Sequence, residues 1–202
     1  MDSSKIRIWN MALGYIGTRN VASENEVTPE AQQCALYWDQ ARRETLRAFP
    51  WNFAQRRIAL AERALPAEWA GEYEYAYALP SKCLKLHRVL RQDARPRPLC
   101  PVPFRLAHDT SGLLLTTEAA AYADYTLDVD NVSLWDDAFA GLLARRLACL
   151  IAVPLLKNNT QKVQELEQLY RAAIPAAQEA CASEEQARPV EDAWILARGH
   201  NL

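Results

Sequence analysis

The stretch Arg47-Ala48-Phe49-Pro50-Trp51-Asn52-Phe53-Ala54 lies where a helical pattern meets an extended one. Pro50 lacks an amide hydrogen and disfavours the helical region for the residue before it, so an arriving helix must end near Ala48. Three aromatic rings fall within five residues. We expect this aromatic corner (Phe49, Pro50, Trp51 and Phe53) to be a buried helix-to-strand elbow. The alternative is an exposed recognition patch, because surface Trp and Phe often mark interfaces.

Apolar residues recur at three- and four-residue spacing in four segments, which predicts helices over residues 3–17, 29–48, 134–153 and 160–182. Thr28-Pro29-Glu30 is a strong start for the second helix, with a capping side chain before a proline. Asn131 or Ser133 is expected to cap the third helix, with Asp136 and Asp137 in its first turn. Pro154 should end or bend that helix, and Pro175 should kink the last one.

The middle of the chain has a different period. Tyr73, Tyr75, Tyr77 and Leu79 alternate with less apolar residues before Pro80, which predicts a half-buried strand. Further strands are predicted at 84–89, 113–115 and 123–129, and the prolines at 96, 98, 101 and 103 indicate an irregular segment or a sheet edge. We therefore predict an α+β fold, mainly α. It is a bundle of about four helices with a small antiparallel β-sheet inserted at about 55–130, between the second and third long helices.

Residues 1–182 are predicted to form a single domain, and residues 183–202 an extended C-terminal tail. The tail is charged from Ser183 to Asp192 and then carries the apolar cluster Trp194, Ile195 and Leu196. So short a cluster cannot form its own core, so it either docks on its own domain or anchors another molecule.

Composition limits the function classes. The formal net charge is -2, which disfavours a dedicated nucleic-acid binder. The five cysteines are odd in number and form no C-x-x-C pair, so neither a disulfide framework nor a zinc site is indicated. Met1–Lys5 lacks a signal-peptide pattern and no apolar run is long enough for a membrane span. We expect synthesis and folding in a reducing cytoplasm.

Charge is unevenly distributed along the chain. Arginines cluster early and glutamates late; the two groups are Arg42, Arg43, Arg47, Arg56, Arg57 and Arg63, and Glu165, Glu167, Glu179, Glu184 and Glu185. This asymmetry would suit subunits that meet head to tail, although an ordinary solvated surface is the simpler interpretation. The early arginines lie near aromatic residues and could also contact phosphates.

No catalytic, cofactor-binding or metal site is predicted. His87, His108 and His200 are widely spaced, and no P-loop, G-x-G-x-x-G or nucleophile elbow occurs. Two carboxylates could in principle form a glycosidase pair, but sequence does not give their separation. The candidates are Glu44, Glu62, Glu72, Glu74, Asp136 and Asp137, of which the last two are explained by helix capping.

The order of these features resembles the tail tubular protein A family of short-tailed bacteriophages, also called head-to-tail adaptors or tail accessory factors. The resemblance rests on three motifs: the second helix with its proline start, the run Arg47–Ala54, and the strand Tyr73–Pro80 with the following Cys83-Leu84. Trp135–Phe139 and Leu147–Leu155 look like the family's third helix. The resemblance covers about residues 3–182.

This resemblance implies a virion structural protein and not an enzyme, made in the host cytoplasm and located in the tail at the portal vertex. Family members form a ring, generally twelve-fold, below the portal protein, where they extend the channel for the genome DNA and dock the tail nozzle protein. The C-terminal segment reaches towards the portal, which assigns Trp194, Ile195 and Leu196 to a portal interface. No cofactor and no membrane contact are implied. The alternatives are a peptidoglycan-degrading virion lysin and a DNA-contacting accessory factor.

Overall fold

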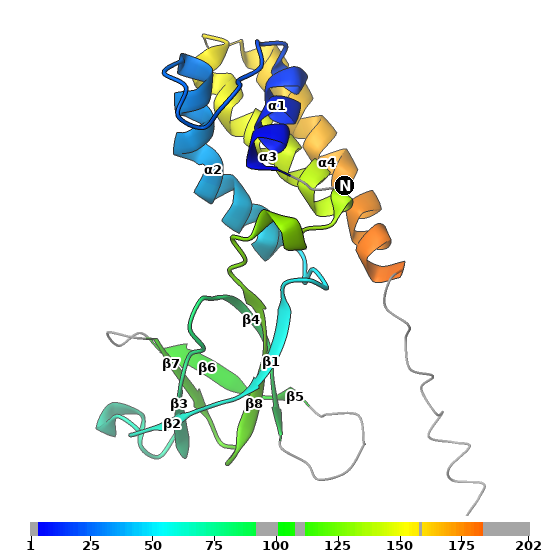
Figure 1. The fold of residues 1–202 in the computed structure, drawn as a ribbon. Helices are drawn as coiled ribbons and strands as arrows, with labels where there is room; N and C mark the ends of the chain where they lie inside the picture. Colours follow the sequence, from blue (N-terminus) through cyan, green and yellow to red (C-terminus); the bar gives the residue numbers. More distant parts are fainter. Residues whose placement is uncertain (1–3, 92–100, 108–111, 158, 184–202) are drawn as a thin grey trace, which may run out of the picture.

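The aromatic corner lies between two halves of the chain in the computed structural model, which describes residues 4–91, 101–107, 112–157 and 159–183. One half consists of helices and the other of strands, and the two are joined end to end (Figure 1). The first two helices belong to the helical half, the strands after the corner form the β half, and the last two helices belong to the helical half again.

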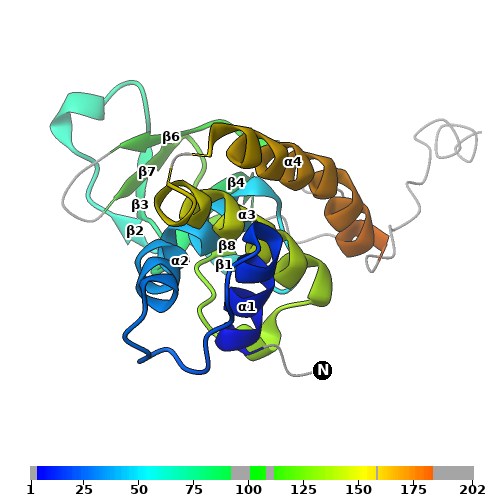
Figure 2. The same cartoon turned by 90° about the horizontal axis from the view of Figure 1, so that it is seen from above.

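Four α-helices form the helical half: α1 (Lys5–Ile16), α2 (Pro29–Ala48), α3 (Asp137–Leu155) and α4 (Thr160–Ser183). Helix α3 packs against each of the other three (Figure 2). Phe139, Leu143, Leu147 and Ile151 on this helix are fully buried. Of the helices in the described ranges, α3 alone is long and apolar enough to span a membrane. Its place at the centre of the helical core accounts for that composition.

Side chains next to the helix ends explain where the helices begin. Ser4 caps α1, and Thr28 caps α2 by accepting a hydrogen bond from Ala31 N. The third helix starts at Asp137 and not at residue 134, because Val132–Leu134 form a short 3₁₀ turn, η2. Asp136 is the cap of α3 and accepts a hydrogen bond from Phe139 N at 2.6 Å, so the predicted caps Asn131 and Ser133 were wrong.

Both internal prolines lie inside helices. Helix α3 continues through Pro154 but ends one residue later, at Leu155. Helix α4 continues through Pro175 to Ser183. Asn159 starts α4, since its side chain accepts a hydrogen bond from Lys162 N.

The predicted bundle with one small sheet is wrong, because the β half contains two four-stranded antiparallel sheets. Sheet A has the order β1-β8-β4-β5 and sheet B the order β2-β3-β7-β6. The strands are β1 (Gln55–Ala59), β2 (Glu62–Arg63), β3 (Tyr75–Ala78), β4 (Cys83–Arg91), β5 (Pro101–Val102), β6 (Phe104–Ala107), β7 (Leu113–Thr116) and β8 (Ala121–Leu127).

The prediction failed at the sheet edges. The segments that it identified as strands became β3, β4, β7 and β8, which are the central strands of the two sheets. All five residues of β1 are exposed, and β2 and β5 have two residues each, so none of these edge strands shows alternating burial. Pro101 does lie in an edge strand, as its lack of an amide hydrogen requires.

The two sheets stack face to face. Tyr77 and Leu114 of sheet B meet Val89 and Ala121 of sheet A in a shared apolar cluster. The other face of sheet B is covered by the β2–β3 connection, from which Trp69 packs over Ala76, Leu113 and Leu115. This connection includes a second 3₁₀ turn, η1 (Ala67–Trp69). The β half therefore has three layers, separate from the larger core of the helical half.

Candidate functional site

The aromatic corner forms a buried joint between the two halves. Trp51 is fully buried, and its ring meets Phe139 edge-on with centroids 5.2 Å apart. Phe49 and Phe53 flank it at 5.5 and 6.4 Å. The Phe49 and Phe139 rings meet Trp51 edge-on and the Phe53 ring stacks on it, and both arrangements are favourable beyond the area that they bury. Trp51 is buried, as expected of an elbow, whereas Phe49, Pro50 and Phe53 are half-buried.

Hydrogen bonds fix the direction in which the chain leaves the corner. Phe49 has an extended backbone, as expected before a proline, and ends α2. Trp51 Nε1 donates to the carbonyl of Thr45 at 2.9 Å, which satisfies one free carbonyl in the last turn of α2. The amides of Ala54 and Gln55 both donate to the Trp51 carbonyl at 2.9 Å, so β1 begins directly after a tight turn.

Asn52 connects the corner to the end of the last helix. Its side-chain amide donates to the carbonyl of Cys181 at 2.7 Å, and its backbone amide lies 3.3 Å from the sulfur of the same residue. Carbonyls in the final turn of a helix have no partner within the helix, so Asn52 supplies one. The end of α4, from which residues 184–202 continue, is therefore held at the joint.

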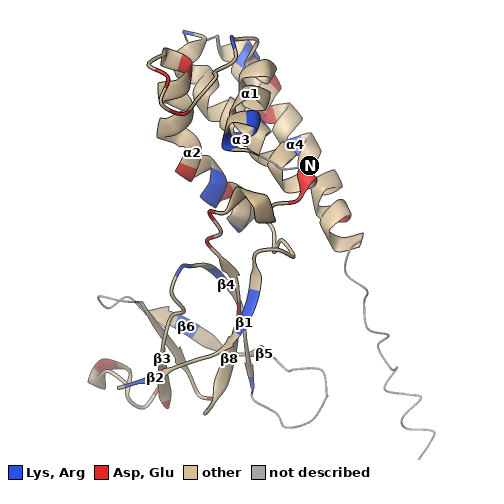
Figure 3. Cartoon of the chain, viewed as in Figure 1, with Lys and Arg blue, Asp and Glu red and all other residues tan. Residues whose placement is uncertain are grey.

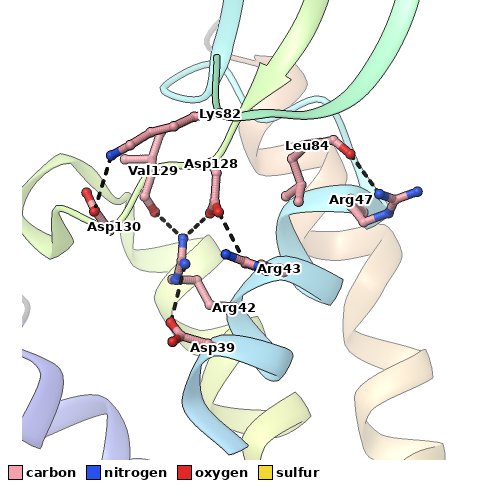
Figure 4. A network of polar contacts seen from close by, with 9 residues as sticks. All are labelled: Asp39, Arg42, Arg43, Arg47, Lys82, Leu84, Asp128, Val129 and Asp130. Carbon is pink, nitrogen blue, oxygen red and sulfur yellow. Dashed lines mark hydrogen bonds and ion pairs between the residues drawn. The ribbon is translucent and has the colours of Figure 1, made fainter. Parts of the chain in front are cut away.

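A group of charged side chains forms the second part of the joint (Figure 4). Arg42 of α2 is almost fully buried; it pairs with Asp128, which follows β8, and donates to the carbonyl of Val129 at 3.0 Å. Arg43 reaches the same carboxylate at 3.1 Å. A buried arginine requires such a partner, because an uncompensated charge in the interior is costly.

Two further contacts run from α2 to β4. Arg47 donates to the carbonyl of Leu84 at 2.7 Å, and Lys85 donates to the carbonyl of Arg47 at 3.0 Å (Figure 4 shows the first). Together with the aromatic corner, these contacts fix the orientation of the β half relative to the helices. The early arginines predicted to contact phosphates are thus engaged within the protein at Arg42, Arg43 and Arg47.

The remaining candidate carboxylates are divided between the two halves of the chain. Glu44 lies in the helical half and binds Arg146 at 2.5 Å, whereas Glu62, Glu72 and Glu74 are exposed in the β half. Burial alone would raise the pKa of Glu44, but hydrogen bonds from Gln40 and Arg146 hold this pKa below its ordinary value. A general acid needs the opposite shift.

The described residues contain no group of His, Cys, Asp and Glu placed to hold a metal ion. His87 contacts Thr126 Oγ1 at 2.7 Å. Burial, together with the charges of Lys85 and Arg88, lowers the pKa of His87 and favours its neutral form. His108, Asp109 and His200 lie outside the described residues, as do Cys100 and the predicted portal contacts Trp194, Ile195 and Leu196.

Sequence comparison adds no assignment: no protein-family model matches the chain, and no curated protein matches it. Sequence reasoning found the aromatic corner but missed the two polar parts of the joint, Asn52–Cys181 and Arg42–Asp128. Both pairs are separated by more than eighty residues in the chain, and no local pattern marks such a contact.

Proposed function

We propose that this protein is a head-to-tail adaptor of a short-tailed bacteriophage, a virion structural protein that forms a ring beneath the portal. In this role the ring, generally twelve-fold in the family, extends the DNA channel and docks the tail nozzle protein. The proposal rests first on the resemblance of the aromatic corner and the tyrosine-rich strand to that family.

The observation that carries the proposal is the joint at the aromatic corner. The segment with the strongest resemblance, Pro50-Trp51-Asn52-Phe53-Ala54, is the place where α2, β1, α3 and α4 are tied together. Contacts of this segment hold the helical half and the β half in one relative orientation. A rigid, elongated subunit of this kind suits the wall of a ring, because each copy must present the same surfaces to its neighbours.

The position of the last helix supports a role for the C-terminal segment. Asn52 holds the end of α4 at the joint, so residues 184–202 continue from a fixed point. We propose that Trp194 and Ile195 insert into a groove of the portal protein, with Leu196 beside them. Large apolar side chains that become fully buried are typical anchors of protein interfaces.

Truncation after Ala182 tests this assignment. The truncated chain keeps the aromatic corner and almost all of α4, so it should retain the helical circular dichroism and cooperative unfolding of the full chain. Binding to a purified portal ring should be lost. The matched variant W194A/I195A in the full-length chain should lose binding too, whereas Arg198→Ala in the same segment should retain it. Normal portal binding by the truncated chain would exclude the tail as the anchor.

A further inference from the structure

The β half presents opposite charges on its two outer faces. One face belongs to sheet A and the other to the β2–β3 connection that covers sheet B, and the two sheets lie between them. Figure 3 shows basic residues on β1 and acidic residues on the connection at the other side of the β half. The two faces define a direction through the subunit.

The face of sheet A is basic. Side chains alternate between the two faces of a strand, so Asp124 lies on the opposite face of β8 from Ala121, which belongs to the apolar cluster between the sheets. Arg57 of β1 and Arg88 of β4 lie opposite Asp124 in the strand register and bind it at 2.5 and 3.0 Å. About half of each arginine side chain remains exposed. Lys85 is exposed and lies opposite Thr126, two residues from Asp124 on β8. It adds a third positive charge to this face, where Asp124 is the carboxylate bound by the arginines.

The connection on the opposite side is acidic. Residues 64–74 carry Glu68, Glu72 and Glu74, all exposed, and contain no lysine or arginine. The connection is held in place by Trp69, over whose ring Arg105 stacks at 4.3 Å. Arg105 also lies 3.7 Å from Glu72. Residues 64–74 together with Arg105 carry three carboxylates and one cation, so this acidic cover has a net negative charge.

We infer that the basic face of one copy (Arg57, Lys85 and Arg88) binds the acidic cover (Glu68, Glu72 and Glu74) of a second copy. This inference rests on the proposed ring. A ring requires two different surfaces on each subunit that fit one another, and these two faces lie on opposite sides of one rigid half. Complementary charge selects the partner and fixes the register between subunits.

A second copy fits the basic face better than a nucleic acid does. Asp124 occupies the middle of this face and already takes hydrogen bonds from Arg57 and Arg88. A phosphate bound there would lie close to that carboxylate. The chain as a whole is also negatively charged, which opposes attraction of DNA from a distance.

The test reverses each face separately. The basic-face variant Q55E/K85E changes two exposed residues of sheet A and retains both arginines on Asp124. It also removes two hydrogen bonds at the joint, from Gln55 to the Pro50 carbonyl and from Lys85 to the Arg47 carbonyl, so recovery in the mixture described below is the measurement that distinguishes a changed face from a disturbed joint. The acidic-cover variant E68K/E74K leaves Glu72 on Arg105. Each variant alone should self-associate at least about tenfold more weakly than the natural chain, because like charges then face one another.

Mixing the two variants separates a lost interface from a lost fold. In the mixture the reversed basic face of one variant meets the reversed cover of the other, and the two natural faces meet one another, so alternating copies should associate again. Two matched controls on the exposed side of α4, E165K/E179K and Q168E/R171E, make the same changes of charge elsewhere. Both controls should associate like the natural chain.

Sedimentation velocity over a range of protein concentrations, at about 50 mM and about 500 mM salt, measures this association, which screening should weaken at the higher salt. Unchanged association of both variants, no recovery in the mixture, or no association of the natural chain at low salt would each overturn the inference. Loss of DNA retention by Q55E/K85E with unchanged self-association would assign the basic face to phosphates instead. None of these measurements uses the portal, so portal binding by the same variants tests the proposed function independently.

Discussion

The side-chain amide of Asn52 donates a hydrogen bond of 2.7 Å to the carbonyl of Cys181, across 129 residues of chain. This contact joins the aromatic corner to the last turn of α4. It sets the point from which the C-terminal segment continues, and so connects the most distinctive sequence motif of the protein to its proposed portal anchor.

Replacing Asn52 by alanine should loosen the end of α4. The buried carbonyl of Cys181 would lose its partner, which we expect to lower the free energy of unfolding by about 1–2 kcal/mol. Hydrogen exchange should accelerate in the last turn of α4 more than elsewhere. Gln55→Ala is the matched control, because it removes an exposed hydrogen bond from the Gln55 side chain to the Pro50 carbonyl in the same corner. It should change the free energy of unfolding by less than about 0.5 kcal/mol. Equal effects of the two changes would contradict the role of Asn52.

Asp128→Asn should strongly destabilise the protein. The substitution removes one of the two carboxylates that pair with the almost fully buried Arg42 and leaves only the exposed Asp39 at 3.3 Å. Loss of the sole partner of a buried charge typically costs about 3–5 kcal/mol, so we expect a cost near the lower end of this range. Chemical denaturation measures the change. Asp130→Asn removes the exposed neighbouring carboxylate that pairs with Lys82, and it should leave the unfolding midpoint nearly unchanged. A small effect of D128N would mean that the joint does not depend on this ion pair.

The free energy of unfolding should fall in acid because Asp124, on the basic face of sheet A, becomes protonated. Burial alone would raise the pKa of Asp124, but the hydrogen bonds and charges of Arg57 and Arg88 outweigh it and lower this pKa. A carboxyl with a lowered pKa in the folded state contributes stability above its unfolded value of about 3.9, and this contribution is lost as the pH falls through the folded value.

The difference in unfolding free energy between the natural chain and Asp124→Asn should therefore be largest above about pH 4 and should shrink towards pH 2. Thermal unfolding at a series of pH values measures it. A difference that stays constant over this range would show that Asp124 is not stabilised by its arginine partners.

The buried thiols should resist modification in the native protein. Burial raises the pKa of Cys34 to about 12 and that of Cys149 to about 11, so almost no reactive thiolate is present at pH 8. Mass spectrometry after treatment with a thiol-specific reagent should find both residues unmodified, and the half-buried Cys83 modified slowly. In strong denaturant all five cysteines should react. Rapid native labelling of Cys34 or Cys149 would contradict the described helical core.

The sequence predicted the helices well because each carries its own signals. Thr28-Pro29 marks the start of α2, and Pro50 forces its end. The sheets were predicted less well. Tyr75 and Tyr77 pack between the sheets and alternate with Ala76, which packs under the β2–β3 connection, whereas β1 is an edge strand whose residues are all exposed. An alternating sequence reflects different surroundings on the two faces of a strand, and an exposed edge strand lacks that difference.

The candidate surfaces were predictable only in part. The aromatic corner is local, so its burial could be predicted from three rings beside a proline. The charges on the two faces of the β half are spread over β1, β4 and the β2–β3 connection, and only the strand register brings Arg57 and Arg88 to the same carboxylate. The early cluster of arginines divides between the joint and the basic face, a division that the linear distribution of charge alone does not show.

The mass of the purified protein by light scattering, alone and after addition of its portal ring, tests the central claim most directly. The account predicts a chain that is mainly monomeric at low concentration and that forms a discrete complex with many copies on the portal, because the portal raises the effective concentration of neighbouring copies. A chain that remains monomeric with intact portal rings would contradict the assignment as a head-to-tail adaptor.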